Sequence, residues 1–412
     1  MQDKGLLKLI VEQITAWCNI NSGSWNLAGL QKMHAVLTEA FSPLGDECKS
    51  ILVAPFTRPD LQGPRPFPKA QILTVQKRPA APLQVMLVGH YDTVFEANHA
   101  FQQVTQKNGT LNGPGVADMK GGICLLLHAL QQFEQLPEAA QLGWKVVLNP
   151  DEELGSQGSM PSLLTWAPHF HVALIFEPAI TEQGGIVSTR KGSGNFVVTA
   201  TGKAAHAGRD FDKGKNAIVG LAELITRIQN LNHQNHPSHQ NHKNQRNPGL
   251  TINVGRILGG TADNIVPPEA RCSLNVRIVT QEQSDWFFQQ MKSLMAEQTE
   301  KSGIQFTLEG NFARPPKTMT TAQDQLFHLV DEAAAAVGQT IERRESGGSC
   351  DGNNLLHDAH LPNIDTLGVC GGGMHSDQEF GLIDTFIPRI NLIVSLLKTL
   401  ARHHKDFHAN PH

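Results

Sequence analysis

Five short segments place histidine or acidic side chains directly after apolar runs and beside glycines. The first is VGHYDT, in which His90 and Asp92 follow an expected strand. Side chains two residues apart on a strand point the same way, so Asp92 can reach one ring nitrogen of His90. That contact would fix the imidazole tautomer and leave the second ring nitrogen for a cation. The alternative interpretation is an ordinary polar strand end.

Carboxylates dominate the next two segments. Asp118 in GPGVADMKGG lies between glycine-rich turns and an expected helix start, where it could equally be a helix N-cap. In NPDEELGSQGS, three successive acids, Asp151, Glu152 and Glu153, lie beside a buried strand. Neighbouring carboxylates repel one another and need water or a cation. One of Glu152 and Glu153 could therefore bind a metal while the other faces a bound water, and a solvated acidic turn is the alternative.

The last two segments also follow expected strands. Glu177 in FEPA ends an apolar run, and His375 in GVCGGGMHSDQEF follows three glycines. Each alone could be structural, but open α/β sheets bind ligands at the carboxyl ends of their strands. Taken together, the five segments form a mixed nitrogen and oxygen ligand set that suits Zn²⁺, with Mn²⁺ or Co²⁺ also possible. Two such ions about 3.5–4 Å apart activate water for the hydrolysis of amides and esters.

The elements that position these residues have an α/β pattern in the first part of the chain. Short apolar runs at 84–89, 145–149 and 172–176 predict strands buried on both faces. The segment 119–133 predicts a helix between the first two strands. Strand alternating with helix favours an α/β layer fold.

The pattern changes near Thr189 and returns after Pro316. In between, we expect strands with one wetter face and two helices, at 195–200, 250–257 and 270–278 and near 215–230 and 284–301. Afterwards we expect a helix, a strand and a final helix, at 322–337, 364–369 and 386–401. The sequence therefore predicts an α/β domain in two parts, 1–189 and 317–412, interrupted by an inserted α+β domain at 190–316.

Composition narrows the classes of function. The chain has 412 residues, with 38 acidic and 34 basic, and this balance gives no global attraction to nucleic acid or an anionic membrane. No run of 18 apolar residues predicts a membrane span. The six cysteines lack CxxC spacing, and the N-terminus lacks the pattern of a signal peptide, so we expect free thiols and a cytoplasmic location.

The His-rich tract 232–247 is either a metal-binding tract or, as Pro237 favours, a solvated loop.

The ordered motifs HYDT, GPGVADMKGG, DEELGSQGS, FEPA, GKAAHAG, GKNAI, GGTADNIVPPEARCSLNVR and GGGMHSDQEF resemble a known family over essentially the whole chain. It is the family of co-catalytic zinc amidohydrolases that includes carboxypeptidase G (glutamate carboxypeptidase), acetylornithine deacetylase and succinyl-diaminopimelate desuccinylase. The resemblance implies a three-layer catalytic domain with a mixed, mostly parallel sheet. It also implies an inserted ferredoxin-like lid through which many members form homodimers.

The resemblance also implies roles at the metal centre, which would hold two Zn²⁺ per chain. Asp118 would bridge both metals, and His90 with Glu177 would complete one site. Glu153 with His375 would complete the other. Asp92 would orient His90 from behind. Glu152 would be the general base that takes a proton from the metal-bridging water and delivers it to the leaving amine.

In the lid, His206 of GKAAHAG matches the histidine that stabilises the oxyanion of the tetrahedral intermediate, which dimeric members supply from the partner subunit. Asn264 and Arg277 match positions that help hold the substrate carboxylate or the intermediate. Arg314 lies where glutamate-preferring members have an arginine for a substrate carboxylate, since a guanidinium grips a carboxylate bidentately. A solvated hinge residue is the alternative for Arg314.

The leading hypothesis is a metal-dependent hydrolase that cleaves an amide or peptide bond next to a free carboxylate, most like a glutamate carboxypeptidase. Its substrate would be a small peptide or an N-acyl amino acid. An N-acyl-amino-acid amidohydrolase with the same site is the second hypothesis. The third is a catalytically inactive homologue that only binds a carboxylated ligand, but such a protein would not need to retain both the ligand set and Glu152.

Overall fold

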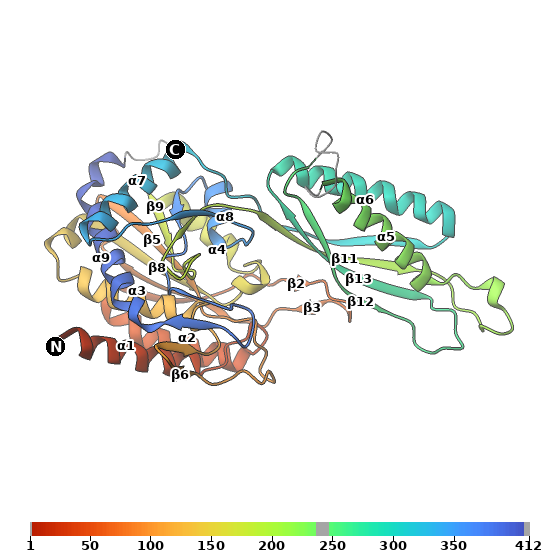
Figure 1. Cartoon of the computed structure of the whole chain (residues 1–412), viewed down its shortest axis with the longest axis horizontal. Coiled ribbons are helices and arrows are strands. Elements are labelled where there is room, and N and C mark those ends of the chain that lie inside the picture. The colour runs from red at the N-terminus through yellow and green to blue at the C-terminus, as the bar shows by residue number, and fades with distance from the viewer. Residues whose placement is uncertain (1, 236–246, 408–412) are drawn as a thin grey trace.

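The protein has two lobes joined by a narrow crossing (Figure 1). The computed structural model describes residues 2–235 and 247–407. The larger lobe holds both ends of the chain, and the smaller lobe is formed by residues 192–314, which we call the insertion. No helix within the two described ranges is long and apolar enough to cross a membrane.

The larger lobe is built on a sheet with strand order β1-β4-β8-β5-β9-β16. Its strands are β1 (Glu47–Leu52), β4 (Gln71–Lys77), β5 (Leu83–His90), β8 (Leu142–Asn149), β9 (Val172–Ile175) and β16 (Asn363–Ile364). β8, β5, β9 and β16 run parallel, whereas β4 pairs antiparallel with both β8 and β1. The sheet is thus mixed and mostly parallel, which confirms the predicted fold class.

Helices cover both faces of this sheet, giving three layers (Figure 1). Four of them pack on one another on one side: α1 (Gln2–Cys18), α3 (Lys120–Phe133), α7 (Thr321–Ala336) and α9 (Phe386–Arg402). On the other side α4 (Met160–Trp166) packs with α8 (Asp351–His357). α2 (Leu27–Phe41) packs against β4 on the side of α3, because Lys77 Nζ contacts both the Leu44 carbonyl just after α2 and Glu134 just after α3. β5 is buried along its whole length, as expected for a central parallel strand.

The insertion has the element order β-α-β-β-α-β of a ferredoxin-like domain. Its elements are β11 (Gly192–Thr201), α5 (Ala217–Asn235), β12 (Thr251–Gly259), β13 (Glu269–Ile278), α6 (Gln281–Ser302) and β14 (Gln305–Arg314). The strands form an antiparallel sheet in the order β12-β13-β11-β14. Both helices pack on one face and close a second hydrophobic core, so the opposite face of the sheet is left open.

Three smaller sheets shape the loops around the larger lobe. One has the order β17-β18-β7-β6 and consists of β6 (Thr105–Lys107), β7 (Thr110–Asn112), β17 (Gly371–Gly372) and β18 (Phe380–Leu382). The second pairs β10 (Ile186–Arg190) with β15 (Arg343–Ser346). The third is a hairpin of β2 (Thr57–Arg58) and β3 (Arg65–Pro66), which extends from the larger lobe toward the insertion (Figure 1).

The chain leaves the larger lobe at Arg190 and returns at Lys317. These two residues form an antiparallel bridge, in which each backbone N–H donates to the other's carbonyl at 2.9 Å. Both side chains are buried against Asp365, with Arg190 Nη2 2.8 Å and Lys317 Nζ 2.7 Å from its carboxylate oxygens. Burial alone would raise the pKa of Asp365, but the two cations hold it well below its usual range.

Three expectations about elements need correction. The strand expected at 364–369 is limited to β16, because the chain turns at Asp365 into the buried ion pairs and Thr366 has a φ of 65°. β14 was not anticipated. α5 continues to Asn235, so the tract 232–247 begins as helix, and its residues 236–246 lie outside the described ranges.

The domain boundaries 1–189, 190–316 and 317–412 stay a prediction about independent folding units.

Candidate metal centre

His90 is the last residue of β5, and its ring is held from behind by Asp92. Its Nδ1 lies 3.3 Å from Asp92 Oδ1 and 3.1 Å from the Asp92 carbonyl oxygen. Asp92 is held in turn, because it accepts hydrogen bonds from Ser24 Oγ at 2.7 Å and from the Glu152 backbone N–H at 3.1 Å. The imidazole orientation is therefore fixed, and its Nε2 faces away from Asp92.

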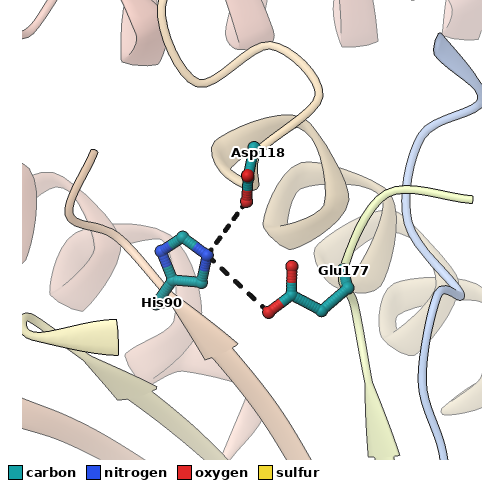
Figure 2. Close-up of side chains that lie close together, drawn as sticks. All are labelled: His90, Asp118 and Glu177. Atoms are coloured by element: carbon teal, nitrogen blue, oxygen red, sulfur yellow. Dashed lines mark hydrogen bonds and ion pairs between the residues drawn. The ribbon is translucent and has the colours of Figure 1, made fainter. Parts of the chain in front are cut away.

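Two triads of ligand atoms meet at a single carboxylate. His90 Nε2 lies 3.1 Å from Asp118 Oδ1 and 3.8 Å from Glu177 Oε1, and the three side chains point toward one another (Figure 2). His375 Nε2 lies 3.3 Å from Asp118 Oδ2 and 3.2 Å from Glu153 Oε2. Within each triad all ligand atoms lie within 4.8 Å of one another. Asp118 thus presents one oxygen to each group.

Sheet register explains this convergence. Parallel pairing sets His90 opposite Asn149, so β5 and β8 end level and the loop with Glu153 begins beside His90. β9 pairs Ile175 with Val88, which brings Glu177 to the same edge. The carboxyl ends of the three central strands therefore deliver ligands to one place, as open α/β sheets do.

Loops deliver the other two ligands. Asp118 precedes α3, and the Glu379 carboxylate holds its loop by accepting hydrogen bonds from the N–H groups of Ala117 at 2.9 Å and Asp118 at 3.0 Å. Burial raises the pKa of Glu379 to about 7. His375 has a φ of 63°, which directs a largely exposed ring back onto the cluster. The sequence analysis does not identify Glu379 as a site residue, because nothing in the spacing of acids within its loop marks this one as functional.

The cluster contains more carboxylates than positively charged groups to balance them. Burial, with a contribution from Asp118, raises the pKa of Glu153 to about 7, and burial raises the pKa of Glu177 well above its usual value. Burial lowers the pKa of His90, but hydrogen bonds to Asp118 and Asp92 outweigh it and raise the pKa. Hydrogen bonds to Asp118 and Glu153 raise the pKa of His375 to about 11. Three buried carboxylates thus compete for few positive charges.

The donor set fits a pair of divalent cations. Imidazole nitrogen and carboxylate oxygen are ligands that Zn²⁺ and similar ions accept. Both triads offer this mixture, share a carboxylate that has an oxygen for each, and lack the positive charge that their acids require. The orienting contact from Asp92 is of the kind that supports a metal-binding histidine.

Glu152 points to a different set of partners from its neighbour Glu153. Arg314 Nη2 lies 2.7 Å from Glu152 Oε1 and also donates to Ser156 Oγ at 2.8 Å. Arg314 Nη1 donates to Asp351 Oδ1 at 2.7 Å and Asn354 Oδ1 at 3.1 Å. Arg314 is only 3% exposed, so this geometry favours a role in holding Glu152 over the capture of a substrate carboxylate expected from the sequence.

A cavity of about 620 Å³ opens onto the cluster between the two lobes. Asp118, Glu152 and Glu177 line it from the larger lobe, and Arg277 of β13 lines it from the insertion. Arg277 is half-buried and donates to neutral groups, the Asn275 Oδ1 at 3.0 Å and the Ser349 Oγ at 3.4 Å. Its position leaves a guanidinium available to an anion in the cavity.

His206 and Asn264 lie elsewhere. Both are exposed on the insertion, outside this cavity, and they neighbour each other because the Ala207 N–H donates to the Asn264 carbonyl at 3.0 Å. The His206 Nδ1 accepts from the N–H groups of Gly208 at 3.1 Å and Arg209 at 3.2 Å. Within one chain, these two residues are thus not brought to the cluster.

The sequence of the chain is similar to those of known peptidases. The profile described as peptidase family M20/M25/M40 matches residues 86–399. Carboxypeptidase G2 from Pseudomonas sp. (strain RS-16) is 27% identical over 312 residues, which make up 74% of this chain and 71% of that protein.

Solved structures with low sequence identity share the fold. The dipeptidase Dug1p from Saccharomyces cerevisiae superposes with a TM-score of 0.77 at 13% identity, covering 97% of each chain. An M20 family metallo-carboxypeptidase from Sulfolobus solfataricus superposes with a TM-score of 0.73 at 16% identity, covering 95% of this chain and 99% of that one. These likenesses extend to the insertion as well as the larger lobe.

Proposed function

Since the chain belongs to peptidase family M20/M25/M40 and is a metallopeptidase of that family, we propose that it cleaves an amide or peptide bond next to a free carboxylate, in the manner of a glutamate carboxypeptidase. The observation that carries this proposal is the pair of ligand triads sharing Asp118 at the edge of the interlobe cavity. The 27% identity to carboxypeptidase G2 supports the choice of bond.

We assign the cations to the two triads, with zinc as the proposed metal. His90 and Glu177 would hold one ion, Glu153 and His375 would hold the other, and Asp118 has a carboxylate oxygen for each. When bound there, the pair of ions would lower the pKa of a water molecule and polarise the scissile carbonyl. Through its contact at Nδ1, Asp92 would keep the His90 Nε2 directed toward such an ion.

Glu152 is the proposed general base. Its carboxylate faces the same cavity as the triads but is directed to Arg314, so it remains free of the ligand set. In that position it takes a proton from the attacking water and returns it to the nitrogen of the leaving amine. The adjacent carboxylates Glu152 and Glu153 thus divide into a proton carrier and a ligand.

Substrate binding involves the insertion. Arg277 lines the same cavity as the triads, and its guanidinium is suited to the free carboxylate of the substrate. His206 and Asn264, exposed and outside this cavity, are proposed to act on the site of a partner subunit in a homodimer formed through the insertion. We propose that the protein is located in the cytoplasm.

Arg314 is proposed to position Glu152 rather than to touch the substrate. Arg314→Ala should lower kcat by roughly 10²-fold with little change in KM, because a misplaced base costs rate while substrate binding is retained. Added guanidinium should restore part of the lost kcat, which a purely structural defect would not allow. Arg344→Ala, an exposed arginine paired with Glu342, is the matched control and should behave as wild type. A raised KM with unchanged kcat would instead assign Arg314 to a substrate carboxylate.

The function itself is tested with a panel of substrates and a chelator. Purified protein is assayed against peptides ending in glutamate and against N-acyl amino acids, and the released amino acid is measured. Chelator should abolish release and Zn²⁺ should restore it. Faster hydrolysis of N-acyl amino acids than of peptides would favour the N-acyl-amino-acid amidohydrolase, which uses the same site. Metal binding without hydrolysis of any member of the panel would favour an inactive homologue.

A further inference from the structure

The hairpin of β2 and β3 forms a second connection between the lobes. At its base, Phe67 stacks on Phe56 with ring centroids 4.8 Å apart, and the Arg65 guanidinium lies 4.0 Å over the Trp25 ring. Its tip reaches the insertion, where Asp60 Oδ2 lies 2.8 Å from Arg256 Nη2. The hairpin is therefore anchored at both ends, and residues between those anchors have defined positions.

Arg58 on this hairpin lies where two cavities meet. It lines the cavity that holds the ligand triads and also a second cavity of about 410 Å³. Asn195 and Asn275 on the open face of the insertion sheet line both as well. The two cavities are thus neighbours along the sheet, and a molecule bound at the triads can extend past Arg58 into the second cavity.

The second cavity has mixed walls, in which the charged groups are all positive. Gln157 and Asn311 supply amide groups, and the cations are Arg58 and Arg256. The charge of Arg256 is already matched by Asp60. Among the described residues that line this cavity there is no aspartate or glutamate. An anionic group would therefore meet no repulsion from its walls.

Arg58 lacks the partner that a half-buried guanidinium needs. Over residues 2–235 and 247–407, no ion pair joins it to a carboxylate, although its neighbours Arg65 and Arg256 each have one. Burial lowers its pKa, the charges of Arg256 and Arg65 lower it further, and Asp60 offsets only part of this, so the surroundings disfavour the cation. Partly desolvated charges that remain unpaired are costly, and binding an anion removes that cost.

We propose that the second cavity is a subsite for the acyl part of the substrate and that Arg58 binds a carboxylate carried there. This inference rests on the proposed hydrolase function, in which Arg277 takes the free carboxylate on the other side of the scissile bond. The two guanidiniums lie on different elements, β2 and β13, and both line the cavity that holds the triads. The preferred substrate class is thus a peptide or N-acyl amino acid with an acidic group on each side of the bond.

The test compares two substrates that differ in one group. N-acetyl-Glu-X and N-acetyl-Gln-X are assayed, where X is the C-terminal residue that the wild-type protein releases best. The wild type should prefer the acidic substrate by roughly 10- to 100-fold in kcat/KM, as expected for a charge-assisted contact. Arg58→Gln should reduce this preference to near unity, mainly by raising KM for the acidic substrate. Hydrolysis of the amide substrate should be retained, which shows that the variant folds.

Two further variants separate charge from hairpin structure. Arg58→Lys keeps a cation and should retain part of the preference. Gln62→Ala alters an exposed side chain of the same hairpin, outside both cavities and both anchors, and should leave the preference unchanged. Equal loss of both substrates in Arg58→Gln, or no preference in the wild type, would overturn the subsite while the hydrolase function stands. Failure of the wild type to cleave any substrate would overturn the proposed function and the subsite together.

Discussion

Glu152→Gln is expected to lower kcat by roughly 10⁴-fold, the upper range for loss of a general base. Glutamine keeps the size of the side chain and can still contact Arg314, but its amide cannot accept the proton from water. Because Glu152 is directed to Arg314 and not to either triad, bound metal should remain at the wild-type level. The measurement is kcat alongside elemental analysis of the same preparation.

Glu345→Gln is a suitable control for that substitution, since it makes the same chemical change at an exposed glutamate. It should show wild-type kcat and metal content. If Glu152→Gln retained normal turnover, another group would have to carry the proton. If it lost metal along with turnover, Glu152 would be a ligand and its assignment would have to be exchanged with that of Glu153.

Asp118→Ala should have an effect of similar size for a different reason. It removes the one carboxylate that contacts both triads, so the affinity for both cations should fall together. Metal assistance is worth several kcal/mol of barrier, so its loss corresponds to roughly 10³-fold or more in rate. Metal titration followed by calorimetry should show weakened binding at both sites, with turnover near that of chelator-treated protein.

Asp377→Ala is the control for Asp118→Ala. Asp377 is an exposed acid in the loop that carries His375, and its side chain is outside both triads. It should bind metal and turn over substrate as the wild type does. Loss of only one metal equivalent in Asp118→Ala would contradict the shared-carboxylate arrangement and would indicate two independent sites.

The convergence of the ligands could be predicted from the sequence because it follows from strand order and direction. His90 and Glu177 each follow an apolar run, and parallel strands bring their carboxyl ends to one edge. The register of β5 with β8 then sets the loop of Glu152 and Glu153 beside them. A general rule of sheet geometry was enough here, and the assignment of separate roles came from the family resemblance.

The partners of Arg314 could not be predicted in this way. Its contacts with Glu152 and Asp351 join segments 162 and 37 residues apart, and no periodic pattern encodes such pairs. The place of Arg58 could not be predicted either, because a two-residue strand in a segment with proline and glycine has too little pattern to indicate where it lies. The position of His206 outside the cavity of the triads likewise depends on how distant segments pack, which no local pattern encodes.

The bridge between Arg190 and Lys317 has a consequence for how such a protein diversifies. A segment that departs and comes back through one adjacent pair imposes no register on the strands beneath it. Mutations in that segment can therefore alter selectivity without disturbing the pairing of β8, β5 and β9, as long as Arg314 and its contact with Glu152 are kept. The ligand triads lie outside the segment, so they can be inherited unchanged while the rest of it varies.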